Sequence, residues 1–399
     1  MVVFRKIRSA WGIAQAYLRG WRTRRQIVVI ESDDWGGIRT ADRQAYDRLV
    51  AAGYALDAMP YGVDALETDE DLERLFDVLQ GVGDSRGRPA CLTANMIMAN
   101  PDFERIRESG FTRYAYEPSH VTLSRRPERR GVTERWAEGL RREVFVPQLH
   151  GREHGQWWRW MAALKEGIEE ERLPFELGMC SAPLPAPKEG ERFFRPVYLD
   201  DETLAREGVD IEAMVREGAA LFKKQFGYTS LSAIAPNCCW TDHVERLWAD
   251  LGVRYIQGEV FQRIGSKARR RPHFIGERGA AGGIYLIRNC CFEPTERPDG
   301  NEVSRCLRQM ARAFRLGKPA IIESHRVHYI GAVSPANRDR GLGALRELLG
   351  TVRRRWPDVI FMSSPELGRL VAFDNDDVDR ADETAILGGA AGPGRCSCA

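Results

Sequence analysis

The sequence lacks the features that mark several classes of protein. None of its apolar runs approaches the roughly 18 residues that a membrane-spanning helix needs. A net charge of +2 creates no overall field that would attract nucleic acid. The nine cysteines contain no Cys-x-x-Cys pair, which argues against a structural zinc ribbon, and they are too few and too irregularly spaced for a disulfide scaffold. We therefore expect a globular, cytoplasmic protein that does not bind nucleic acid.

The two ends of the chain differ in composition from the rest. Residues 1–26 hold seven lysines and arginines and no acid. Apolar side chains recur there at helical spacing, at Phe4, Ile7, Trp11, Ala14, Leu18 and Trp21. We predict a helix packed on the main domain. The alternatives are a peripheral contact with an anionic membrane surface and a signal peptide, against which Gln15 and Arg19 argue. Residues 373–399 are predicted to be a disordered tail.

Between these ends, residues 27–372 alternate short apolar runs with helical patterns. The predicted strands are Ile27–Ser32, Ala90–Met96, Val144–Leu149, Phe175–Cys180, Leu231–Pro236, Val253–Gly258, Gly283–Asn289, Ala320–Ser324 and Val359–Ser363. The predicted helices are Thr40–Ala52, Glu67–Gly81, Pro101–Gly110, His154–Glu169, Asp210–Phe226, Asp242–Leu251, Asn301–Leu316 and Asn337–Arg355. Repeated β/α units favour a barrel or a doubly wound sheet. A barrel places its chemistry where its strands end.

Polar side chains gather where four predicted strands end. These side chains are Asp33 and Asp34 on the first strand, His150 and His154 after the third, Asn237 after the fifth, and His325 after the eighth. The four-residue spacing of the two histidines would point both imidazoles the same way from the first turn of a helix, where they could hold one metal ion. Two unrelated histidines on a helix surface are the alternative.

The adjacent aspartates could serve one site only where the chain turns. Neighbouring residues of a regular strand face opposite sides, and Gly36–Gly37 offers the turn. One carboxylate could then bind a metal while the other takes a proton, although an acidic loop that caps the next helix fits equally. Two histidines and one aspartate leave a coordination position for water, which is the arrangement of a catalytic zinc. The second carboxylate could then act as base and a histidine across the site as acid.

These motifs resemble those of the NodB-homology polysaccharide deacetylases, within the wider glycoside hydrolase/deacetylase superfamily. Ser32-Asp33-Asp34 resembles the family's Thr-Phe-Asp-Asp motif, His150 to His154 resembles His-(Ser/Thr)-x-x-His, and the strand that ends at His325 resembles the last motif. The resemblance implies a distorted (β/α)7 barrel. It also implies a divalent metal, zinc or alternatively cobalt or another ion, held by Asp34, His150 and His154, with Asp33 as base and His325 as acid.

The chain departs from the family pattern at three places. The third motif, Arg-x-Pro-Tyr, supplies an arginine that holds the base, but the comparable strand end here reads Ile234-Ala-Pro-Asn237. No Asp-x-x-Asp-Trp motif is found, and Gly151 stands where the family has Ser or Thr. Arg288 or Glu293 could replace the missing charged partner, but a surface turn is the favoured interpretation of that segment.

Aromatic and polar residues beside the motifs are candidates for substrate binding. Trp35 or Trp240 is predicted to line the pocket, because indole rings pack on sugar faces. A backbone N–H near Asn237 could hold the oxyanion, and Glu293 is a further candidate. We expect a hydrolase that removes an acetyl group from an N-acetylated sugar. A catalytically inactive glycan-binding barrel and a C–N hydrolase of a non-sugar amide are the alternatives.

Overall fold

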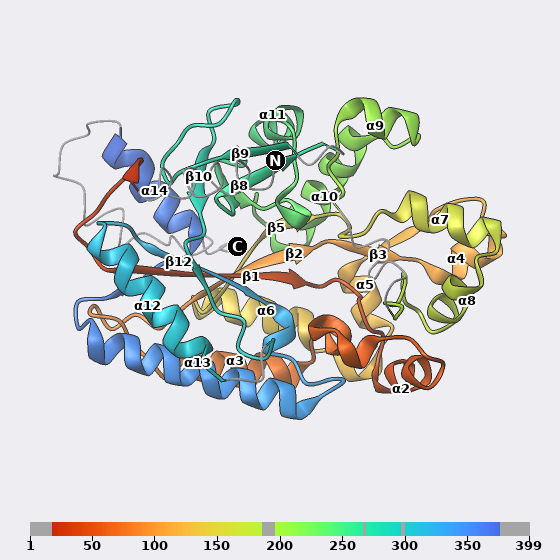
Figure 1. Cartoon of the computed structure of the whole chain (residues 1–399), viewed down its shortest axis with the longest axis horizontal. Coiled ribbons are helices and arrows are strands. Elements are labelled where there is room, and N and C mark those ends of the chain that lie inside the picture. The colour runs from red at the N-terminus through yellow and green to blue at the C-terminus, as the bar shows by residue number, and fades with distance from the viewer. Residues whose placement is uncertain (1–17, 186–195, 266–268, 297–299, 376–399) are drawn as a thin grey trace, which may run out of the picture.

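The computed structural model describes residues 18–185, 196–265, 269–296 and 300–375. Residues 1–17 of the predicted N-terminal helix lie outside the described residues, and residues 19–26 are not helical, so the prediction is wrong there. Of the predicted tail, residues 373–375 belong to the last helix and residues 376–399 lie outside the described residues. The described chain is built around one nine-stranded sheet (Figure 1). Its strands are β1 (Ile27–Trp35), β2 (Leu92–Ile97), β5 (Phe145–Gly151), β6 (Ser232–Ala233), β7 (Tyr255–Gly258), β10 (Ile284–Ile287), β11 (Cys290–Cys291), β12 (Ala320–His325) and β13 (Ile360–Phe361).

All pairings within this sheet are parallel. The strand order is β10-β7-β6-β5-β2-β1-β12-β11, and β13 pairs with the start of β1. The helices lie against this curled sheet (Figure 1). The predicted α/β barrel architecture is confirmed. The barrel is a curled sheet whose two edge strands are β10 and β11.

The centre of the sheet explains why its strands read as apolar runs. Every residue of β1 is buried, as is every residue of β2, because helices or other strands cover both faces. Strand β1 lies between β2 and β12. Its pairing with β12 ends at Asp33, which lies opposite His325. The sheet therefore brings these two residues together at the C-terminal ends of adjacent strands.

Each of the eight helices predicted within residues 27–372 overlaps a helix of the structure. The helices are α2 (Arg43–Ala51), α3 (Asp69–Gln80), α4 (Phe103–Glu108), α5 (Ser119–Ser124), α6 (Val132–Arg141), α7 (Trp157–Glu166), α8 (Glu169–Glu176), α9 (Asp201–Arg206), α10 (Ile211–Phe226), α11 (Asp242–Asp250), α12 (Glu302–Arg315), α13 (Pro335–Arg355) and α14 (Ser364–Asn375). Of these, α5, α6, α8, α9 and α14 were not predicted. Short 3-10 turns are η1 (Leu56–Ala58), η2 (Pro60–Val63), η3 (Pro127–Arg129), η4 (Pro236–Cys238) and η5 (Arg326–His328). Helix α3 begins at a reciprocal cap between Thr68 and Asp71.

Three predicted strands differ from the structure. Of the run Val359–Ser363, only Ile360–Phe361 is strand. The run Phe175–Cys180 is not a strand: Phe175 belongs to α8 and packs against Trp160 and Phe111 in a separate apolar cluster. Its apolar side chains serve helix packing, which a short run cannot distinguish from a buried strand. The run Leu231–Pro236 keeps only Ser232–Ala233 as strand, because the chain turns into η4 at Pro236.

Two antiparallel ribbons project beyond the sheet. They pair β3 (Ala99–Pro101) with β4 (Tyr116–Pro118), and β8 (Phe261–Ile264) with β9 (Arg269–Pro272). Within the described ranges, no helix has the length and apolar character that crossing a bilayer requires.

Candidate metal centre and acid–base pair

The end of β1 bends so that its two aspartates diverge. The pairing of β1 with β2 shifts register between Ser32 and Trp35, and Asp34 adopts a left-handed backbone conformation, with φ 76°. Such a conformation is uncommon for a residue other than glycine and must be held by its surroundings. The carboxylate of Glu67 accepts the backbone N–H of Gly36 at 3.1 Å. The two adjacent carboxylates can therefore serve one site, because the strand is no longer regular where they stand.

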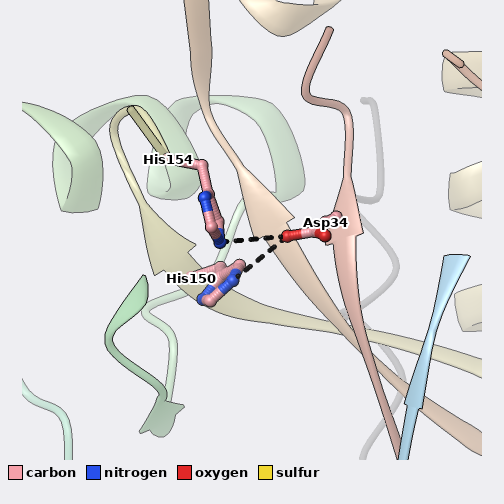
Figure 2. Close-up of side chains that lie close together, drawn as sticks. All are labelled: Asp34, His150 and His154. Atoms are coloured by element: carbon pink, nitrogen blue, oxygen red, sulfur yellow. Dashed lines mark ion pairs between the residues drawn. The ribbon is translucent and has the colours of Figure 1, made fainter. Parts of the chain in front are cut away.

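Asp34, His150 and His154 converge on one point, although 116 residues separate the first two (Figure 2). Nε2 of each histidine lies 3.4 Å from Oδ1 of Asp34, and three possible ligand atoms lie within 4.8 Å of one another. Two atoms bound at about 2.1 Å to one tetrahedral zinc ion would stand roughly 3.4 Å apart. The three side chains thus already have the spacing of metal ligands.

Their hydrogen bonding also fits a metal. Oδ1 of Asp34 is buried and accepts no hydrogen bond from the described residues. Nδ1 of His150 lies 3.0 Å from the carbonyl oxygen of Ile234, and a hydrogen bond donated there leaves Nε2 free to bind a cation. Burial lowers the pKa of His154 to about 4, so this ring is neutral and able to act as a ligand at neutral pH.

The two histidines meet by a route that differs from the prediction. The expected shared helical turn is wrong: His150 belongs to strand β5, and His154 lies on the bend before α7, which begins at Trp157. Gly151 allows the change of direction, because its φ of 150° lies in a region that favours glycine. The two ring centroids are 5.1 Å apart.

We expect His154→Ala to lose a bound divalent metal while keeping the fold. His154 lies on a bend outside the apolar core, and a catalytic metal stabilises the protein only by binding its native state. Elemental analysis of protein purified without a chelator measures the metal. His243→Ala, which removes a histidine of α11 that pairs with Asp201, is the matched control and should retain it. If excess chelator unfolded the wild type globally, the site would be structural instead.

A buried arginine holds Asp33. Nη1 and Nη2 of Arg288 donate to the two carboxylate oxygens at 2.9 and 2.7 Å, and Nε donates to Glu31 at 2.7 Å. Nδ2 of Asn95 adds a further bond to Oδ1 of Asp33, at 2.7 Å. Burial alone would raise the pKa of Asp33, but the Arg288 guanidinium holds it well below its usual range. Asp33 is therefore an anion with a fixed orientation.

A glutamate plays the corresponding part for His325. Oε1 of Glu293 lies 2.8 Å from Nδ1 of His325, and Oε2 bonds Nε2 of His328. On its other side, His328 contacts the hydroxyl of Thr295. Burial opposes the charge on His325, but Glu293 together with the two aspartates raises the pKa of its ring to about 10. His325 is therefore a cation whose Nε2 faces the Asp33 carboxylate.

The interpretation of the Arg288–Glu293 segment as a surface turn is wrong. Arg288 and Glu293 are 5% and 6% exposed. Strand β10 leads straight into β11, so the segment crosses the site end of the sheet. The charged partner of Asp33 and the charged partner of His325 therefore both come from this one segment.

The two tryptophans predicted to line the pocket do not do so. Trp35 is completely buried: its Nε1 donates to Ser32, and its ring packs edge-on against Phe145 at 5.0 Å. Trp240 is also completely buried, and its Nε1 donates to Glu245 at 2.8 Å. Both indoles fill the core behind the motif loops, so neither offers a face to a sugar.

Asn237 follows a strand end that contacts one of the candidate metal ligands. It belongs to η4, three residues after Ile234, whose carbonyl contacts His150. Its backbone is left-handed, with φ 56°, and its buried Oδ1 accepts no hydrogen bond from the described residues. Its role toward an oxyanion stays a prediction.

Several residues at the site gave no recognisable signal in the sequence. The ring of Tyr61, in η2, packs edge-on against His325 with centroids 5.3 Å apart, and the Arg39 guanidinium lies 4.7 Å above the Tyr61 ring. Glu67, which holds the turn after Asp34, also pairs with the buried Arg326 at 3.0 Å. All but Arg326 come from the connections between β1 and α3, which contain no strand end that would point to a site.

Comparison with known proteins gives remote similarities only. No family model matches the chain, and no curated protein matches it. A proposed polysaccharide deacetylase from Mycobacterium smegmatis shares 13% identity at a TM-score of 0.42, over 90% of this chain and 94% of that one. A proposed glycoside hydrolase/deacetylase from Parabacteroides distasonis shares 12% at 0.46, over 90% and 75%. A CE4 family pseudoenzyme from Bacillus anthracis shares 8% at 0.35, over 84% and 63%. Polysaccharide deacetylases are thus among the structures that the chain resembles, at TM-scores too low to assign an activity.

Proposed function

We propose that this chain is a metal-dependent hydrolase that removes an acetyl group from an N-acetylated sugar. One observation carries the proposal: an aspartate held as an anion and a histidine held as a cation face each other beside a set of metal ligands. Nε2 of His325 lies 3.9 Å from Oδ2 of Asp33, and Asp34 is the next residue along the chain. A base and an acid of this kind are what hydrolysis of an amide requires.

The residues divide the reaction between them. A divalent metal bound by Asp34, His150 and His154 would lower the pKa of a water molecule and polarise the substrate carbonyl. Asp33 accepts the proton that the attacking water loses. Arg288 keeps the Asp33 carboxylate oriented toward that water, because its two parallel hydrogen bonds fix the plane of the group.

His325 completes the reaction by protonating the leaving amine. Glu293 fixes the ring through Nδ1 and leaves Nε2 directed to the same side as Asp33. An amine leaves readily only after it gains a proton, so the acid must stand across the scissile bond from the base. The acetylated sugar itself is inferred from the resemblance of the three motifs to those of the deacetylases.

Acetate release from N-acetylated oligosaccharides tests this function. The protein should release acetate after addition of zinc or cobalt and should release none with excess chelator. A simple non-sugar N-acetyl amide, assayed in parallel, separates a sugar deacetylase from a general C–N hydrolase. Glycan binding without acetate release, in protein shown to contain metal, would contradict the proposal and favour a binding protein.

We expect Glu293→Gln to shift the alkaline limb of the pH–rate profile to lower pH. Glu293 helps to raise the pKa of His325, so the protonated acid persists to higher pH in the wild type. The amide keeps a hydrogen-bond acceptor but removes the negative charge, and the pKa of His325 falls. The profile of kcat against pH measures the shift. Glu296→Gln, three residues away, should leave it in place, and an unchanged profile in Glu293→Gln would remove His325 as the acid.

A further inference from the structure

The end of the sheet opposite the metal centre carries a basic groove. It is lined by Gln26, Arg308, Phe314, Arg315, Arg355 and Trp356, together with Ala311. Helices α12 and α13 end at Arg315 and Arg355, and β1 begins at Ile27, so the groove lies where the strands start. The site residues Asp33 and His325 stand at the other ends of the same strands.

The groove has one sign of charge. Arg308, Arg315 and Arg355 are exposed, and none forms an ion pair with a carboxylate in the part of the chain that the structure describes. The residues that line the groove include three arginines and no aspartate or glutamate. The acids that flank these arginines in the sequence include Glu302, Glu347 and Asp358, and Glu302 pairs with Arg305. A surface of this kind attracts a polyanion.

Aromatic side chains lie among these arginines. Trp356 is partly exposed, Phe314 packs edge-on against it with centroids 5.0 Å apart, and the Arg355 guanidinium lies 5.0 Å above its ring. Indoles flanked by cations suit the boundary between lipid headgroups and acyl chains. A groove for a soluble phosphate would not need apolar rings at its rim.

The N-terminal segment is fixed to this same end of the molecule. The buried ammonium of Lys318 binds the carbonyl oxygens of Arg19, Gly20 and Trp21. Leu18, where the described chain begins, is 60% exposed and is one of two large apolar side chains exposed in the described residues. The 17 residues before it in the sequence carry Arg5, Lys6 and Arg8 and no acid.

We propose that this basic face docks on an anionic phospholipid bilayer. The groove arginines contact the headgroups, Trp356 reaches the headgroup boundary, and the metal centre at the other strand ends faces away from the membrane. The inference does not depend on the hydrolase activity, because it uses none of the site residues.

Vesicle co-sedimentation of the full-length chain tests the proposal. We expect binding to vesicles of phosphatidylcholine mixed with phosphatidylglycerol and none to phosphatidylcholine alone. The triple variant R308Q/R315Q/R355Q should bind the anionic vesicles on the order of 100-fold more weakly, since each basic residue near such a surface contributes roughly a five-fold factor. The control R130Q/K165Q/R206Q removes three exposed basic residues of other elements and should bind as the wild type does.

Four results would overturn the proposal. They are equal binding to neutral and anionic vesicles, absence of vesicle binding, displacement from vesicles by millimolar inorganic phosphate at constant ionic strength, and wild-type binding by the triple variant. If R5Q/K6Q/R8Q alone lost binding, the first residues and not the groove would be the determinant. Thermal melts establish that each variant is folded, and acetate release need not be measured.

Discussion

Asp33→Asn should retain metal at the wild-type stoichiometry and lose activity by a factor on the order of 10²–10⁴, the usual share of general-base catalysis. The amide keeps the shape of the side chain but cannot accept the proton of the attacking water. Asp34 and the two histidines keep their positions, since the bend that places Asp34 is held by Glu67. Metal content and kcat, measured on the same preparation, test both halves of this expectation.

Asp34→Asn is the matched comparison. It removes charge from the metal ligand set and should weaken metal binding, with partial recovery of activity at high metal concentration. If Asp33→Asn lost its metal or worked as well as the wild type, the division of roles would be wrong. Glu323 would then be the next candidate base, because burial raises its pKa to about 7.

The second large effect is expected at Arg288. Arg288→Met should reduce the free energy of unfolding by about 3–5 kcal/mol, because it leaves buried carboxylates without their cation. Glu31 is fully buried and Asp33 is 5% exposed, so water cannot replace the hydrogen bonds that Arg288 donates to them. Arg288→Lys keeps one charge but loses the planar fork, and should recover part of the stability while the activity stays low. Urea unfolding and kcat measure the two quantities.

The stability loss should depend on pH with a definite sign. Arg288 lowers the pKa of Asp33 in the folded state, so this interaction stabilises the protein above the unfolded pKa of about 3.9 and is lost as the pH falls through the folded value. The difference between wild type and Arg288→Met should therefore be large at pH 7 and shrink below roughly pH 4. A difference that grew toward acid pH would contradict the placement of charge on Asp33. Arg86→Met, on an exposed turn, is a control that should change little.

The sequence predicted the site where chemistry and local pattern coincide. Asp33, Asp34 and His325 follow apolar strands, so their position at one end of a parallel sheet could be inferred. The Gly36–Gly37 pair indicated a turn, but the register shift and the left-handed Asp34 that let both carboxylates serve one site depend on tertiary contacts such as Glu67.

The partners of the acid and base could not be inferred in the same way. Arg288 and Glu293 flank two cysteines in a segment whose polar residues resemble those of a turn. They are buried because the segment crosses from one edge of the sheet, β10, to the other edge, β11. This arrangement depends on long-range contacts, so the local sequence pattern does not reveal it. Trp35 and Trp240 show the opposite error. We predicted that they line the pocket because they adjoin the motifs in the sequence, but both side chains are buried in the core.

The pairing of Asp33 with His325 in the register of β1 and β12 has a mechanical consequence. Adjacent strands stand roughly 4.8 Å apart, and hydrogen bonds along both chains maintain that spacing. The backbone separation of the two residues that transfer protons is therefore a property of the sheet ladder. His154 and Tyr61 belong to a bend and a 3-10 turn, where no such ladder fixes the backbone. The sheet thus sets the backbone spacing of the acid and the base, whereas the bend and the turn can vary without changing that spacing.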